Sequence, residues 1–503
     1  MNGKLQGIIV CTVIAASLAG VMVFLTKTGD TDKKGKDDSS SKASAAGTVE
    51  EDESVIILEK DSSEINSIHV SNEHGEFTVS KPTSGKASWT VEELGGINQN
   101  TTRKESMVTI SGLMEAKKLV EENAGDLSKY GLDEPLSTFT VTYRDHTEAV
   151  VYIGDEAPES RYNYVRVEGS NNVYMVLGTK LTYFTDPVTA YAELALIATP
   201  SNESWPDYGV ETVTRSDWDY EVTFENDPND IEGMLSSQVI SSPIFAYLNI
   251  TGSSNVTHGM WGLTAADCVV VKPTEEQLSE YGLDDPFCTV SLKGDEYDYY
   301  LRIGNEAFDP DIPEDETPVK LGYYCYLEGV SGADCIYLIS ESSLPWTTFK
   351  IENVITSIMT ANYLVDLSQI TIEVGGEKTV YDITSNGSSK DTNEDGSVAD
   401  VTSVKCGGEE LDVENFKSLY QYIMTCPTDE ICFTDPEGDS ELTITETRTD
   451  GGGDTIELFK DTSRRYIVKL NGRTSFRIQS TWVDTLLKNM DNVKNGVKID
   501  ENY

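Results

Sequence analysis

The sequence predicts an α+β protein built from tandem repeats of mainly antiparallel β-sheet, with one or two helices in each repeat, behind a single N-terminal transmembrane helix. Three observations predict this architecture: an uncharged apolar run near the N-terminus, a nine-residue motif that returns about one domain length later, and short segments in which apolar and polar residues alternate. A chain of 503 residues is too long for one hydrophobic core, and roughly three domains are expected.

The composition indicates a folded and strongly acidic protein. The chain has 86 Asp and Glu against 38 Lys and Arg, which gives a formal net charge of −48. Its hydrophobic fraction of 38% is enough to form buried cores. So much negative charge repels phosphate backbones, and we therefore expect no nucleic-acid partner.

The N-terminal apolar run predicts a membrane anchor. Residues 5–25 carry no charge, and a helix of this length, at about 1.5 Å per residue, crosses a hydrocarbon core of about 30 Å. We expect a cytoplasmic tail at 1–4, a transmembrane anchor at 5–26, and the membrane lipid bilayer as a partner. The alternative is a cleaved signal peptide, but the run is longer than the apolar part of such peptides usually is.

The charges that flank this run point in two directions. Lys27, Lys33, Lys34 and Lys36 follow it, and positive charge favours the cytoplasmic side. A short tail on a signal-like segment stays in the cytoplasm, however, and large domains cross membranes largely regardless of charge. We expect a single-pass protein of the cell membrane with the bulk of the chain extracytoplasmic. Residues 27–53 have almost no apolar residues to bury and are expected to be a flexible linker.

Internal repeats define the rest of the chain. The motif LSKYGLDEP at 127–135 returns as LSEYGLDDP at 278–286, and an Ile-Gly pair follows each copy, at 153–154 and at 303–304. The segment 466–478 repeats the closing hairpin more faintly. We predict repeat domain 1 at 54–205, repeat domain 2 at 206–365 and a divergent repeat domain 3 at 366–503.

Each repeat is expected to run in the order hairpin, helix, strand, turn and antiparallel strands. Apolar residues alternate with polar ones in the opening hairpins, at 65–79, 220–224 and 370–374. In the third repeat Asp412 can cap a helix. The apolar face of that helix comprises Phe416, Leu419, Tyr420, Ile423 and Met424, and the weaker face in the first repeat comprises Met107, Ile110 and Met114.

The repeated motif has a structural interpretation. If it ends a helical turn, its glycine takes a left-handed conformation, its second leucine folds back onto the first, and its proline stops the helix. The residues concerned are Tyr130, Gly131, Leu132 and Pro135 in the first copy, and Tyr281, Gly282, Leu283 and Pro286 in the second. The alternative is a ligand loop that uses Asp133 and Asp284.

With these motifs the sequence resembles the bacterial family called domain of unknown function 4340, well over 54–365 and loosely over 366–503. The resemblance implies no established enzymatic activity and therefore no catalytic residues. Members are often encoded beside an ABC-type transport system of the kind linked to gliding motility. The resemblance thus implies a non-enzymatic accessory or scaffold component of a cell-envelope transport system, with ABC-type transporter subunits as partners. The alternative is an extracytoplasmic binding protein for cell-wall glycan or a small ligand.

The residues themselves also predict no enzyme and no cofactor. The four histidines are scattered, and no nucleophile, phosphate-loop or zinc pattern occurs. One segment has the ligand spacing of a calcium loop, with Asp391, Asn393 and Asp395. Position 12 of that loop is Thr402 instead of a carboxylate, so a solvated loop is the alternative.

Seven cysteines lie in the body of the chain. Cys325 and Cys335 fall on the two arms of one predicted hairpin, and Cys426 and Cys432 flank a predicted turn. Either pair is a candidate disulfide in an oxidising compartment. Reduced, buried thiols are the alternative.

Overall fold

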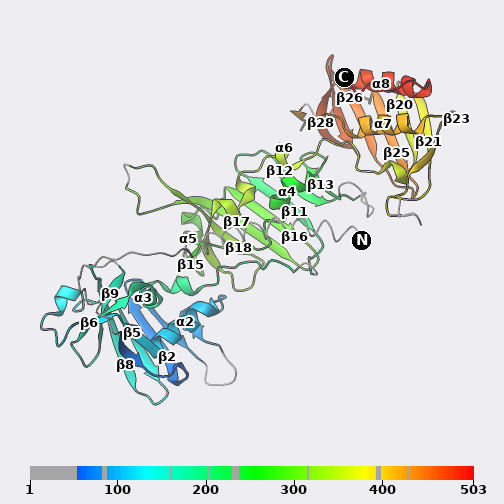
Figure 1. Ribbon diagram of the computed structural model, residues 1–503. Coiled ribbons are helices and arrows are strands. Elements are labelled where there is room, and N and C mark those ends of the chain that lie inside the picture. Colours follow the sequence, from blue (N-terminus) through cyan, green and yellow to red (C-terminus); the bar gives the residue numbers. More distant parts are fainter. Residues whose placement is uncertain are drawn as a thin grey trace, which may run out of the picture. The chain divides into compact units, whose positions relative to one another are not determined.

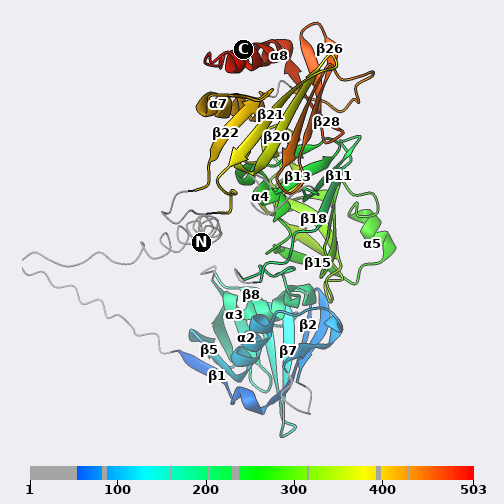
Figure 2. The same ribbon diagram turned by 90° about the vertical axis from the view of Figure 1, so that its right-hand side faces the viewer.

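The computed structural model describes residues 54–81, 88–158, 161–201, 204–228, 237–313, 316–391, 398–427 and 430–502 (Figures 1 and 2). The expected tail, anchor and linker, at 1–53, lie outside these ranges. Within them, none of the helices has the length and apolar character needed to span a bilayer.

Antiparallel β-sheet is the main regular structure of the described residues, and seven α-helices accompany it in the described part of the chain. The chain divides into two compact units. Unit 1 holds the described residues up to Ile65, Thr109–Phe184 and Pro200–Trp205, and unit 2 holds Asn66–Val108, Thr185–Thr199 and the rest of the chain from Pro206. The domain boundaries expected from the repeats stay predictions.

Unit 1 contains a two-stranded sheet and a run of five antiparallel strands. The small sheet pairs β1 (Val55–Glu59) with β5 (Leu113–Ala116). The run has the order β7 (Ser137–Tyr143), β8 (Glu148–Glu156), β9 (Tyr162–Val167), β10 (Val173–Leu177) and β6 (Lys118–Glu121). Helix α3 (Gly178–Thr185) packs on this run, because the Phe184 ring stacks on Phe139 with centroids 3.9 Å apart.

Unit 2 begins with the opening strands of the first repeat. Their order is β4 (Thr90–Val91), β3 (Gly75–Ser80) and β2 (Ile65–Asn72). The predicted alternation is confirmed here, since Ile68, Val70, Phe77 and Val79 are all buried on one face. Helix α2 (Thr101–Gly112) follows, and its end from Thr109 belongs to unit 1.

The second sheet, also in unit 2, has nine strands. Its order is β14 (Ala246–Tyr247), β13 (Gln238–Ser242), β12 (Glu221–Asn226), β11 (Val210–Arg215), β16 (Cys288–Lys293), β17 (Asp298–Phe308), β18 (Lys320–Glu328), β19 (Cys335–Ile339) and β15 (Asp267–Val271). Its helices are α4 (Ile250–Thr257), α5 (Glu275–Glu280) and α6 (Ile351–Val354).

The third sheet also has nine strands. Its order is β23 (Glu409–Glu410), β22 (Val401–Cys406), β21 (Glu377–Ser385), β20 (Leu367–Val374), β25 (Leu442–Arg448), β26 (Thr455–Thr462), β27 (Arg465–Leu470), β28 (Arg473–Gln479) and β24 (Glu430–Ile431). Helices α7 (Val413–Met424) and α8 (Ser480–Lys494) lie on one face of it (Figure 2). The Tyr422 and Trp482 rings stack between the two helices, 5.2 Å apart.

The strand orders show that the β-sheet domain is repeated. Counted along the chain, the nine strands of the second sheet and those of the third follow the same spatial order, 4-3-2-1-6-7-8-9-5. The two runs of the first repeat follow the corresponding parts of it. The third repeat is therefore divergent in its turn residues but keeps the strand order of the second.

The predicted helix of the third repeat is confirmed and that of the first needs a correction. The carboxylate of Asp412 caps α7 by accepting a hydrogen bond from Asn415 N at 2.8 Å. In the first repeat, α2 ends at Gly112. Met114, expected on the helix, instead lies buried in strand β5, because its side chain fills the core from the sheet.

Candidate functional site

The repeated Tyr-Gly-Leu motif forms a turn at the end of a short helical segment. In the first copy, residues 127–130 form one 3₁₀ turn and Gly131 has φ +64° and ψ +22°. Leu132 N then donates to Leu127 O at 3.1 Å, and the Leu132 side chain is buried. This is the helix end that the sequence predicts.

The second copy repeats the turn, here at the end of helix α5. Gly282 has φ +70°, Leu283 N donates to Leu278 O at 2.8 Å, and the Leu283 side chain is fully buried. The aromatic contact is repeated as well: Tyr130 meets Tyr164 edge-on with centroids 4.8 Å apart, and Tyr281 meets Tyr324 at 4.6 Å.

The Ile-Gly pair of each repeat lies directly against this turn. A Cβ atom added to Gly154 would lie 2.1 Å from Tyr130 O, and one added to Gly304 would lie 2.3 Å from Tyr281 O. Only glycine allows so close an approach of the backbone. The two motifs therefore return together because they form one contact.

The prolines and acids of the motif lie outside this contact. Asp133 and Asp284 are exposed, and Pro135 and Pro286 are only partly buried. The motif residues thus divide into a left-handed glycine and a buried leucine, which form the turn, and an exposed acidic edge.

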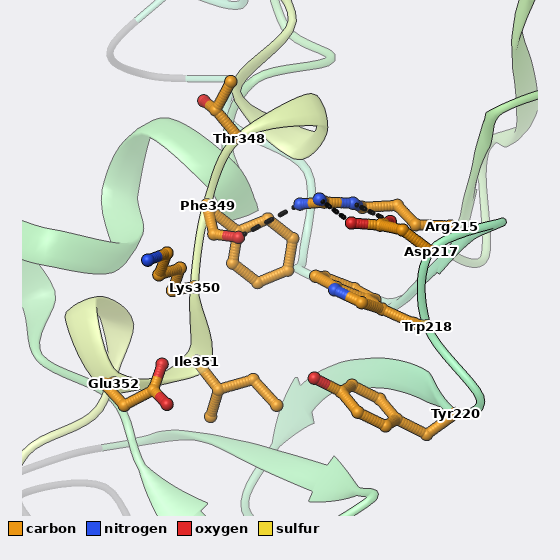
Figure 3. A pocket seen from close by; sticks show the side chains of 9 residues that line it. All are labelled: Arg215, Asp217, Trp218, Tyr220, Thr348, Phe349, Lys350, Ile351 and Glu352. Atoms are coloured by element: carbon orange, nitrogen blue, oxygen red, sulfur yellow. Dashed lines mark hydrogen bonds and ion pairs between the residues drawn. The ribbon is translucent and has the colours of Figure 1, made fainter.

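A separate hollow of about 350 Å³ lies in unit 2, lined by Arg215, Asp217, Trp218, Tyr220, Thr348, Phe349, Lys350, Ile351 and Glu352 (Figure 3). The guanidinium of Arg215 organises it. Arg215 donates from Nε and Nη2 to the Asp217 carboxylate, at 2.9 and 2.6 Å, and from Nη1 to Phe349 O at 3.2 Å. These bonds hold the pKa of Asp217 below its usual value.

An aromatic row extends from this guanidinium. Arg215 lies 4.4 Å from the centre of the Trp218 ring. Trp218 stacks on Tyr220 at 5.2 Å, and Tyr220 stacks on Phe433 at 5.0 Å. Each ring covers a face of the next, so the hollow offers a ligand mainly the ring edges and the exposed Lys350 and Glu352 side chains.

Sequence reasoning missed this hollow. One side comes from the turn between β11 and β12, and the other from residues 348–352, more than a hundred positions later. The cluster Arg-Ser-Asp-Trp-Asp-Tyr at 215–220 is the local signal that could have pointed to it.

Two buried glutamates of unit 2 have pKa values raised far above the ordinary value of a carboxyl group. Burial raises the pKa of Glu211 to about 8, although Trp346 Nε1 donates to its Oε1 at 2.8 Å and thereby opposes the shift. Burial, and then the nearby Asp454 carboxylate, raise the pKa of Glu446 to about 8. Neither residue lines the hollow, so these acids are part of the protein interior.

The polar network around Glu446 joins several segments. Thr360 Oγ1 donates to Glu446 Oε2 at 2.6 Å, and Asn362 Nδ2 donates to the same oxygen at 2.7 Å. Arg448 Nη1 donates to Asn362 Oδ1 at 3.1 Å. Tyr247 of the second sheet reaches this network by its hydroxyl, 3.2 Å from Asp454 Oδ2.

The predicted calcium loop is described only in part. Asn393 and Asp395 lie outside the described residues, so the calcium-loop prediction stays a prediction. The Asp391 carboxylate accepts hydrogen bonds from Ser388 N at 2.8 Å and from Ser388 Oγ at 2.9 Å. In the described ranges no group of three or more His, Cys, Asp or Glu side chains has the arrangement of a metal site.

The described cysteines are free thiols, and six of the seven are buried. Cys325 opposes Tyr337 on the neighbouring strand rather than Cys335. The thiol that meets Cys335 is that of Cys268, on β15.

The comparison with known families agrees with the motifs. Residues 89–202 match the family described as domain of unknown function (DUF4340). This range includes the first Tyr-Gly-Leu turn and the Ile-Gly pair that lies against it. Among curated proteins, none matches the chain. The chain thus carries a domain of the DUF4340 family at residues 89–202.

Proposed function

We propose that this chain is a single-pass, membrane-anchored, extracytoplasmic protein that acts as a non-enzymatic accessory or scaffold component of an ABC-type transport system of the cell envelope. The proposal combines the uncharged segment at 5–25 with the family resemblance and with the way unit 2 is built. The acidic body is kept away from anionic lipid by its own charge, while the linker at 27–53 gives it reach.

The observation that carries the scaffold role is the direct backbone linkage between successive repeats within unit 2. Asn98 N, from the first repeat, donates to Gly332 O of the second at 2.8 Å. Phe245 N, from the second sheet, donates to Thr474 O of the third at 3.0 Å, and Ser475 Oγ donates back to Phe245 O. Main-chain bonds of this kind hold neighbouring repeats in register, as a protein that presents fixed surfaces to partners requires.

The perturbed acids also support a role without catalysis. Glu211 and Glu446 are buried at 0% and 2% exposure, and their hydrogen-bond donors come from the protein itself. A general acid or base must reach a substrate, and these two carboxyl groups face the interior instead.

Co-purification tests the proposal. The tagged full chain, solubilised from its native membranes in mild detergent, is expected to retain a membrane-spanning and a nucleotide-binding subunit of an ABC-type transporter. Removal of residues 1–26 is expected to release the body into the soluble fraction. Recovery of the full chain without transporter subunits would reject the accessory role.

A second candidate function is the binding of a small polar ligand in the hollow beside Arg215. The observation that favours it is the exposed pair of opposite charges, Lys350 and Glu352, on the rim of an aromatic row. N-acetylglucosamine is a suitable probe for a cell-wall sugar. Saturable binding that Lys350→Ala abolishes, and that the distant Phe308→Ala leaves unchanged, would favour this function.

A further inference from the structure

Two cysteines far apart in the sequence meet on adjacent strands of the second sheet. Cys268 lies in β15 and Cys335 in β19, and these strands pair antiparallel. Cys268 opposes Tyr337 and Cys335 opposes Val271, with a register shift between Cys268 and Val270. The two thiol groups interact with each other, and each changes the pKa of the other.

Both side chains are in the interior. Cys268 is 1% exposed and Cys335 is 0% exposed. Cys268 is the only residue of β15 with a buried side chain. It is therefore the one side chain that this strand places in the core, where it meets Cys335. A disulfide needs converging Cβ vectors and Cα atoms within about 7 Å of each other. Diagonal neighbours on one face of paired strands come close to this distance.

The pairs suggested by sequence spacing lack this contact. Cys325 Sγ is directed to Tyr323 O at 3.6 Å. Cys426 Sγ lies 4.0 Å from Pro427 O, and Cys432 Sγ lies 3.3 Å from Thr434 O. Cys268 and Cys335, in contrast, lie on paired strands and their thiol groups interact.

We propose that Cys268 and Cys335 form a disulfide when the chain folds in the presence of a disulfide oxidant, and that this bond staples the edge strand β15 to β19. The inference concerns the body of the chain alone and does not depend on the proposed function.

The environment of the pair favours one direction of reaction. The hydrogen bond from Cys268, and to a lesser extent that from Tyr337, lowers the pKa of Cys335, while the pKa of Cys268 is raised, first by its bond to Cys335 and then by burial. The thiolate is the attacking species in thiol–disulfide exchange. In this proposal Cys335 is the first nucleophile and Cys268 is the resolving thiol.

With glutathione disulfide as oxidant the reaction balances. The Cys335 thiolate attacks one sulfur of glutathione disulfide, which forms a mixed disulfide and releases one glutathione thiolate. Cys268 loses its proton and attacks the Cys335 sulfur, which releases the second glutathione. The two cysteines lose two electrons and two protons in total, and one glutathione disulfide becomes two molecules of glutathione.

Peptide mapping tests the proposal. Full-length chain is reduced, denatured, refolded in detergent with glutathione disulfide, alkylated and digested without reductant by a protease that cleaves after glutamate. Glu328 separates Cys325 from Cys335, and Glu275 separates Cys268 from Cys288, so the digest distinguishes the pairs. We expect the Cys268 peptide linked to the Cys335 peptide. Alkylation of both thiols, or linkage of either to another cysteine, would overturn the proposal.

Two variants serve as controls. Cys426→Ser is expected to keep the link, and Cys268→Ala is expected to leave Cys335 open to alkylation. A melting measurement tests the wild type and the Cys268→Ala variant with and without reductant. We expect reductant to lower the melting temperature of the oxidised wild type but not that of the variant. An unchanged wild-type melting temperature would contradict the staple.

Discussion

Glu446 Oε2 and Asp454 Oδ2 accept hydrogen bonds from one and the same amide nitrogen, Asn362 Nδ2, at 2.7 and 2.8 Å. The hydroxyl of Thr360 lies 2.6 Å from the first oxygen and 3.0 Å from the second. One hydroxyl proton cannot be donated to both oxygens, so the two carboxyl groups compete for it. Burial and the Asp454 charge, which raise the pKa of Glu446 to about 8, identify Glu446 as the protonated partner.

This relationship predicts that stability falls as the pH rises from about 4.5 to 8. The pKa of Glu446 in the folded protein is raised above the ordinary value of 4.5 for a glutamate. The stabilising contribution is therefore fully present below about pH 4.5, and it is lost as the pH rises through about 8. At pH 9 we expect the free energy of unfolding of Glu446→Gln to exceed that of the wild type, by a few kcal/mol at most. Urea denaturation measures this difference.

The matched control is Glu457→Gln on the adjacent strand β26. Glu457 is only partly buried, so this change is expected to leave the pH dependence intact. A residual slope in Glu446→Gln is expected from Glu211, whose pKa is also about 8. If Glu446→Gln and Glu457→Gln have the same pH profile, Glu446 does not hold the proton.

Trp346→Phe is expected to destabilise the second sheet by about 1–3 kcal/mol. The substitution keeps a buried ring but removes the donor 2.8 Å from Glu211 Oε1, which leaves a buried acceptor without that bond. Urea denaturation at pH 7 measures the change. Trp205→Phe, at a site 43% exposed, should shift the midpoint by much less, and equal shifts would show that the Glu211 bond contributes nothing.

Gly304→Ala is expected to destabilise the chain by about 1–3 kcal/mol, because its Cβ would lie 2.3 Å from Tyr281 O and push the turn off strand β17. Gly154→Ala should behave alike in the first repeat, where the corresponding distance is 2.1 Å. Gly125→Ala is the control, since its Cβ meets nothing within 4 Å. Equal melting temperatures for the three variants would refute the contact between turn and strand.

The sequence predicted the repeats well because each repeat has a local signature. Alternating residues such as Ile68 and Val70 specify one buried face. The glycines at 131 and 282 predict the left-handed turn, because that backbone conformation is costly for other residues. Asp412 likewise predicts where helix α7 begins, because its side chain can cap the first turn.

Contacts between distant segments could not be predicted in this way. Arg215 bonds to Phe349 O, and Cys268 meets Cys335, only because the strand order of the second sheet brings them together. The spacing of Cys325 and Cys335 suggested a pair on one hairpin, but the register of β18 and β19 sets Cys325 opposite Tyr337. Met114 was assigned to the helix because a spacing of three or four residues does not reveal where a helix ends.

The most direct test of the scaffold proposal combines purification with one disrupted repeat junction. Phe245 N donates to Thr474 O at the junction between the second and third sheets, and Ser475 Oγ donates to Phe245 O. Ser475→Val removes that hydroxyl donor, while Ser342→Ala changes a hydroxyl on the exposed surface. From detergent-solubilised native membranes, the wild type and Ser342→Ala are expected to retain the membrane-spanning and nucleotide-binding transporter subunits in equal amounts, and Ser475→Val to retain several-fold less. Transporter subunits absent from the wild-type preparation would contradict the account.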